Sequence, residues 1–124
     1  MSYRTSYSRA VGLGAAHEGV EHWWGQRVSS IALIPLTLLF LFPFASNLGQ
    51  DHQTVLAAYA HPFHAIVAVL FFVVACSHLK QGLQVVIEDY IHGPAMRTAV
   101  LLGSTFLCWI LGLTGVFAVA RIAL

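Results

Sequence analysis

The chain has 124 residues, of which 58% are hydrophobic and only 9% are charged, and its formal net charge is +1. Ordinary soluble domains carry about 25% charged residues, so this composition excludes an ordinary soluble domain and indicates an integral membrane protein. The six basic residues form no cluster of the kind that binds nucleic acid or anionic lipid. The apolar composition therefore predicts contact with membrane lipid, and the lack of a basic cluster predicts no nucleic acid among the partners.

Residues 1 to about 25 are polar to amphipathic and lack the apolar core of a cleavable signal peptide, so we expect this N-terminal segment to stay on the protein. A first long apolar run follows, from about 28 to 48. Pro35 and Pro43 interrupt the run, and membrane helices tolerate proline when neighbouring groups satisfy the freed carbonyls. The run predicts a first transmembrane helix with a kink.

A short polar link, Gly49 to His61, leads to Pro62, which is a favourable residue for the first turn of a helix. The apolar segment from 62 to about 87 would span ~39 Å at ~1.5 Å per residue, more than the ~30 Å hydrocarbon layer requires. A polar turn ends this segment, and a third apolar run covers about 97 to 122. The sequence thus predicts an all-α membrane protein in which residues 1–124 form one domain with three transmembrane helices.

Basic residues near the helix ends predict the orientation, because cytoplasmic loops carry an excess of lysine and arginine. The first loop has no basic residue, whereas four arginines lie on the opposite side. These are Arg4, Arg9, Arg27 and Arg97. We expect the N terminus to face the cytoplasm, or the matrix if the source is mitochondrial. His22, Trp23 and Trp24 suit an aromatic belt at that interface, where an anchoring role is preferred to a catalytic one.

The second predicted helix carries ionisable groups, which cost at least ~2.5 kcal/mol each for Lys or Asp at membrane depth and therefore suggest function. His78 and Asp89 are eleven residues apart, which separates them by only ~20° around a helix and by ~16 Å along it. Gly82 lies on the same face, where a glycine lets a backbone or a flat macrocycle approach closely. Lys80 points ~160° away from His78, so we exclude it from this site.

Of the seven histidines, only His78 lies near the middle of a predicted span. A neutral imidazole is a good axial ligand for haem iron, and two helices of a membrane bundle can each supply one. A lone histidine in a membrane span can equally form an interhelical hydrogen bond. Cys76 and Cys108 fall inside apolar segments, where we interpret them as small buried hydrophobic residues without a chemical role.

The stretch from His78 through Gly82, Gln84 and Val85 to Asp89-Tyr90 resembles the small membrane-anchor subunits of succinate dehydrogenase, which are the hydrophobic cytochrome b subunits of respiratory complex II. An Arg-Val-Ser-Ser sequence at 27–30 extends the likeness. The resemblance implies a haem-binding helical bundle formed with a second cytochrome b anchor subunit. It also implies that the chain, itself non-catalytic, anchors flavoprotein and iron–sulfur subunits that transfer electrons from succinate to ubiquinone. The implied location is the bacterial inner membrane, or alternatively the mitochondrial inner membrane.

The resemblance also assigns roles to individual residues. His78 matches the axial ligand of haem b, and the second ligand comes from the other anchor subunit. Tyr90 matches a tyrosine that donates a hydrogen bond to a ubiquinone carbonyl, and Asp89 matches the adjacent acid beside the quinone pocket. Arg27 matches a basic residue near the haem propionates and the quinone headgroup, and Gly82 would allow close approach of the haem.

Two alternatives remain at this point. A fumarate reductase anchor would run the reaction in reverse with a lower-potential quinol and can lack haem. A haem-free structural subunit of another respiratory complex would use the polar groups of the second helix only for interhelical hydrogen bonds. A quinone-specificity assay would distinguish a fumarate reductase anchor from a succinate dehydrogenase anchor. The absence of a bound chromophore would favour the haem-free structural subunit.

Overall fold

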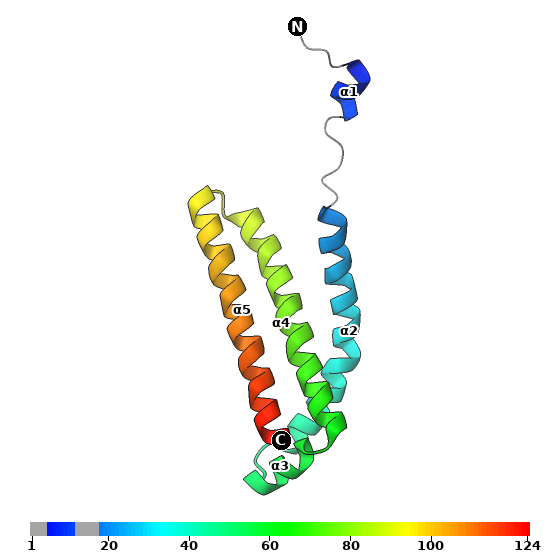
Figure 1. The fold of residues 1–124 in the computed structure, drawn as a ribbon, viewed down its shortest axis with the longest axis vertical. Coiled ribbons are helices and arrows are strands. Elements are labelled where there is room, and N and C mark those ends of the chain that lie inside the picture. The colour runs from blue at the N-terminus through cyan, green and yellow to red at the C-terminus, as the bar shows by residue number, and fades with distance from the viewer. Residues whose placement is uncertain (1–4, 12–17) are drawn as a thin grey trace.

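A computed structural model describes residues 5–11 and 18–124, so the expectation for Arg4 lies outside the described residues. Within that part the elements are α1 (Ser6–Val11), α2 (Glu18–Ser46), α3 (His52–Tyr59), α4 (Pro62–Tyr90) and α5 (Pro94–Ala123), as Figure 1 shows. No strand occurs among these residues. Helices α2, α4 and α5 are long and apolar enough to cross a membrane. The predicted all-α fold with three membrane-spanning helices is confirmed.

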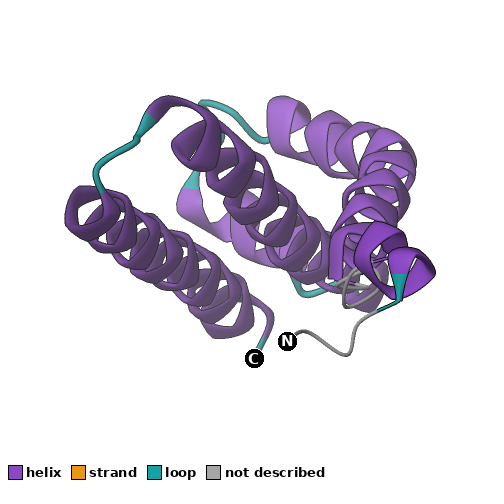
Figure 2. Ribbon diagram, turned by 90° about the horizontal axis from the view of Figure 1, so that it is seen from above, coloured by secondary structure: helices purple, strands orange, loops and turns teal. Residues whose placement is uncertain are grey.

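Helix α4 is the middle element of the molecule. It packs against α2 on one side and against α5 on the other, as Figures 1 and 2 show. The start of α2 and the connection from α4 to α5 lie at one end, while α3 and the C terminus lie at the opposite end. Large apolar side chains remain exposed on all three long helices, among them Ile31, Ile66 and Phe106. This arrangement leaves extensive apolar surface for lipid and for other chains.

The first membrane helix begins ten residues earlier than expected, at Glu18 instead of 28. No proline occurs before Pro35, so nothing in the polar stretch from 18 to 27 stops the helix. Pro35 and Pro43 both lie inside α2. With 29 residues, α2 extends ~43 Å at ~1.5 Å per residue, which is longer than the ~30 Å hydrocarbon layer. Its polar N-terminal turns therefore reach beyond the apolar layer or line its edge.

The link between the first two membrane helices contains α3, which the sequence pattern did not predict. Gly49, with a φ of 78°, makes the turn after α2 in a left-handed conformation that favours glycine. The Thr54 hydroxyl donates a hydrogen bond to the Asp51 carboxylate and thereby lowers the pKa of Asp51. The Nδ1 of His64 in α4 lies 2.9 Å from the carbonyl oxygen of Ala58 and ties α3 to α4. At eight residues, α3 is too short for a periodic pattern to reveal it.

The apolar core lies at the end of the molecule that carries α3. Tyr59, Ala68 and Val119 are buried there, and Phe40 and Phe72 pack against them. As predicted, Pro62 occupies the first turn of α4. The core thus fixes α4 between its neighbours at one end, while toward its other end α4 buries Ile87 and contacts α2 through polar side chains.

Candidate functional site around His78

His78 is half-buried in α4 and faces α2. Its Nδ1 atom lies 2.9 Å from the hydroxyl oxygen of Ser29, and its Nε2 atom lies 3.3 Å from the side-chain nitrogen of Gln26. Both partners come from the N-terminal half of α2. The contacts join positions 49 and 52 residues apart in the chain, so they fix how α2 and α4 face each other.

The chemistry of these partners selects one tautomer of His78. An amide nitrogen can only donate a hydrogen bond, so Gln26 donates to Nε2 and the proton of the neutral ring is on Nδ1. Nδ1–H then donates to the Ser29 hydroxyl, whose own proton is directed at the carbonyl oxygen of Gly25, 2.8 Å away. The two contacts agree with each other. His78 therefore keeps a lone pair on Nε2, the nitrogen that is turned away from Ser29.

Two glycines make room for long polar side chains, because each glycine lies opposite a glutamine of the facing helix. The side-chain amide of Gln81 in α4 lies against Gly25, where an added β-carbon would be 3.3 Å from it. The amide of Gln26 in α2 lies near Gly82, where an added β-carbon would be 3.6 Å from the Gln26 nitrogen. Gly82 thus lies on the face of α4 that carries His78, as the helical spacing predicts. In this chain, the side chain that fills the space over Gly82 belongs to Gln26.

Three buried polar side-chain atoms of α2 and α4 have no hydrogen-bond partner in the described part of the chain. They are Nε2 of His22, Oε1 of Gln26 and Oε1 of Gln81. A buried polar atom without a partner costs about 1–3 kcal/mol, so such a group calls for a ligand, a water molecule or another chain. The interface of α2 and α4 is therefore polar and incompletely satisfied at this end.

Of the remaining predicted residues, two lie at the end of α4 away from His78, and Arg27 lies inside α2 next to Gln26. Asp89 and Tyr90 are the last two residues of α4, and the Tyr90 side chain is 79% exposed. Twelve residues separate Tyr90 from His78, which corresponds to ~18 Å along the helix. The Arg27 side chain is exposed, and its guanidinium carbon lies 5.4 Å from the centre of the Trp23 ring. The start of α2 and the end of α4 share one end of the molecule (Figure 1).

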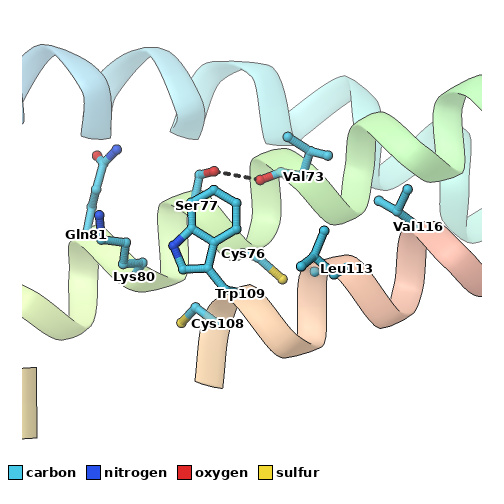
Figure 3. Close-up of a pocket in the computed structure, with 10 residues that line it drawn as sticks. Val73, Cys76, Ser77, Lys80, Gln81, Cys108, Trp109, Leu113 and Val116 are labelled. Atoms are coloured by element: carbon cyan, nitrogen blue, oxygen red, sulfur yellow. Dashed lines mark hydrogen bonds between the residues drawn. The ribbon is translucent and has the colours of Figure 1, made fainter. Parts of the chain in front are cut away.

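Lys80 lies on the opposite side of α4, which confirms that it does not share a site with His78. It lines a cavity of about 240 Å³ between α4 and α5. Figure 3 shows Lys80 and Cys76 from α4 together with Cys108 and Trp109 from α5. Both cysteine thiols are free, and Cys108 is buried. Gln81 also lines this cavity, so it connects the cavity with the polar interface around His78.

Ser29 and Gln26 were not predicted from the sequence as residues of the site, and His22 was interpreted only as part of an aromatic belt. The signal was available, because His22, Gln26 and Ser29 follow one another at intervals of four and three residues. That spacing places them on one face of a helix. The expected helix start at 28 hid this stripe by leaving its first two members outside the helix.

Comparison with known proteins identifies similar chains. The family model described as "Succinate dehydrogenase/Fumarate reductase transmembrane subunit" matches residues 1–116. A protein from Paracoccus denitrificans, named succinate dehydrogenase hydrophobic membrane anchor subunit, is 36% identical over 124 residues, which cover 100% of this chain and 95% of that one. No solved structure matches the chain significantly.

Two further relatives carry similar names. A succinate dehydrogenase hydrophobic membrane anchor subunit from Rickettsia bellii (strain RML369-C) is 28% identical over 81% of this chain and 80% of its own length. A succinate dehydrogenase membrane anchor subunit from Reclinomonas americana is 33% identical over 64% of this chain and 68% of its own length.

Proposed function

The chain belongs to the family of succinate dehydrogenase/fumarate reductase transmembrane subunits, and we propose that it holds haem b and ubiquinone at the inner membrane together with a second anchor subunit. It is a non-catalytic, multi-pass membrane subunit whose named relatives are succinate dehydrogenase anchors. In the proposed complex it anchors a flavoprotein subunit and an iron–sulfur subunit on the side of the membrane that carries the N terminus. The observation that carries the proposal is the pair of contacts with Ser29 and Gln26 that orients His78 in the central membrane helix.

The residues around His78 fit a haem. An iron ligand must offer an unprotonated ring nitrogen, and the contacts of Ser29 and Gln26 leave Nε2 in that form. The Gln26 amide stands in front of Nε2. Its oxygen has no partner in the described part of the chain, so a change of side-chain rotamer removes it without breaking a second hydrogen bond. Bound haem would supply a one-electron redox centre near the quinone and a rigid plate that joins the two anchor subunits.

The exposed end of α4 supports a quinone site there. A quinone headgroup must lie where protons arrive from water while its isoprenoid tail stays in lipid, and Tyr90 is at such a boundary. Its hydroxyl donates a hydrogen bond to a quinone carbonyl and polarises it. Asp89, the neighbouring residue, transfers a proton or pairs with an arginine of the second anchor subunit. Reduction of the quinone takes two electrons, which reach it through the iron–sulfur subunit, and two protons, and yields the quinol.

An absorption difference spectrum tests the haem assignment. We would purify the complex in mild detergent through a tag on this chain and compare dithionite-reduced with oxidised samples. The expected result is a b-type haem band that co-purifies with flavin in the wild type and disappears in His78→Ala. His52→Ala, at the exposed start of α3, is the matched control and should retain the band.

A haem-free anchor remains the second candidate, and one observation favours it. Both ring nitrogens of His78 already have partners on α2, which is the arrangement of a purely structural histidine. A wild-type complex that contains flavin but no haem band would establish this alternative. A quinone-specificity assay distinguishes a fumarate reductase anchor from a succinate dehydrogenase anchor, because the former prefers a lower-potential quinol.

A further inference from the structure

We propose that Ser29 is the positioning residue of His78, fixing the ring in the orientation and tautomer in which Nε2 binds iron. This inference rests on the proposed haem function. It concerns a residue outside the sequence signal that pointed to His78, since Ser29 lies on a different membrane helix, 49 positions earlier in the chain.

A histidine at membrane depth has two ring nitrogens, and a ligand is competent only if the other nitrogen carries the proton. The Ser29 hydroxyl oxygen is 2.9 Å from Nδ1, a normal hydrogen-bond distance, and it accepts the Nδ1 proton. Histidine ligands of metals generally donate their second ring N–H to such a partner, which fixes the ring and raises its basicity.

Ser29 is itself held in place by its own helix. Its hydroxyl proton is directed at the backbone, with the carbonyl oxygens of Gly25 and Gln26 at 2.8 and 3.1 Å. The hydroxyl therefore has its proton engaged and a lone pair free toward His78. A hydroxyl whose proton is used by its own helix accepts from Nδ1–H, which favours the tautomer with the lone pair on Nε2.

Ser30, the next residue, provides a matched control. Its hydroxyl also donates to the carbonyl oxygen of Gln26, at 2.7 Å, but its hydrogen bond is confined to α2. Ser29 and Ser30 thus share residue type, helix and backbone hydrogen bond. They differ in the contact with His78, so any difference between their variants reports that contact.

The test compares Ser29→Ala, Ser29→Thr and Ser30→Ala in the purified complex. We would measure the haem-to-flavin ratio, the midpoint potential of the haem by redox titration, and the EPR g values of the oxidised haem. Loss of the hydrogen bond makes the imidazole less basic and stabilises the ferric state less. Ser29→Ala should therefore raise the midpoint potential, shift the g values and lower haem occupancy. Ser29→Thr, which keeps the hydroxyl, should restore wild-type values, and Ser30→Ala should match the wild type.

Each other outcome overturns the inference. If Ser29→Ala keeps the potential and g values of the wild type, Ser29 does not position His78, although the haem assignment stands. If Ser29→Ala does not assemble, Ser29→Cys, which is similar in size and a weak acceptor, is measured in the same way and must show the same shifts. If both fail to assemble while Ser29→Thr succeeds, the hydroxyl serves helix packing alone. A wild-type complex without haem rejects the proposed function itself, which distinguishes that failure from this one.

Discussion

Gly115 of α5 faces the ring of Phe72 of α4 so closely that a β-carbon on Gly115 would lie 2.5 Å from Cδ1 of Phe72. Two more atoms of the ring would be within 2.8 Å. The ring has little freedom to move, because it also packs edge-on against Phe40 and Phe71. This contact sets how near α5 can approach the central helix, and only glycine permits it.

Replacement of Gly115 with alanine should therefore destabilise the α4–α5 interface. Overpacking of this kind costs about 1–3 kcal/mol, of which the higher helix propensity of alanine offsets at most ~1 kcal/mol. Thermal denaturation of the purified complex, followed by loss of helical circular dichroism, should show a lower midpoint for Gly115→Ala. The control is Gly103→Ala on the same helix, where nothing lies within 4 Å of an added β-carbon. Equal midpoints for the two variants would show that Phe72 yields without cost.

Removal of the Tyr90 hydroxyl should slow quinone reduction by about 2- to 10-fold, the equivalent of one hydrogen bond worth ~0.5–1.5 kcal/mol. Succinate oxidation by an artificial soluble acceptor should not change in Tyr90→Phe, because that electron path ends before the quinone. Tyr59→Phe makes the same change in α3, at the opposite end of the molecule, and should leave both activities intact. A loss of both activities in Tyr90→Phe would instead indicate a defect in assembly.

Asp89→Asn should lower the turnover of quinone reduction more than it changes the KM for quinone. The substitution keeps the size of the side chain but removes its ability to transfer a proton, and positioned acids and bases contribute about 10²-fold or more. The comparison is with Glu88→Gln, the preceding acid, whose carboxylate accepts a hydrogen bond of 2.9 Å from Gln84 along the same helix. Steady-state assays with a soluble ubiquinone analogue measure both constants. Similar effects of the two substitutions would show that Asp89 acts only through the negative charge at this end of the molecule and not by transferring a proton.

Gln26→Ala should leave haem occupancy at the wild-type level, because the Gln26 amide must move away from Nε2 of His78 before iron can bind there. When both are produced under haem limitation, the complex with Gln26→Ala should be less stable than the wild-type complex by ~1 kcal/mol. The reason is that the hydrogen bond to Nε2 is then lost without replacement. The haem-to-flavin ratio and the thermal midpoint check the two parts separately. Haem loss as complete as in His78→Ala would show that the Gln26 side chain contributes to the haem-bound site and does not move away when haem binds.

Much of the fold follows from the sequence because membrane insertion is a local property. An apolar run of about 20 residues must form a helix to satisfy its backbone in lipid, so α2, α4 and α5 were predicted from hydropathy alone. The helix start at Pro62 and the opposite directions of His78 and Lys80 follow from equally local rules of helix geometry. The early start of α2 and the presence of α3 did not, since neither segment carries an apolar run of membrane length.

The sequence by itself determined that this is a three-span membrane protein with one histidine at mid-depth and an acid and a tyrosine at the end of the same helix. Only the tertiary structure decided that Ser29 and Gln26 are the residues that meet His78. The physical reason is that helices that are apolar on nearly every side have no single face that must turn inward. Their rotation about the helix axis is set by packing contacts between residues far apart in the chain, so the polar stripe of α2 does not indicate by itself which residues of α4 it meets.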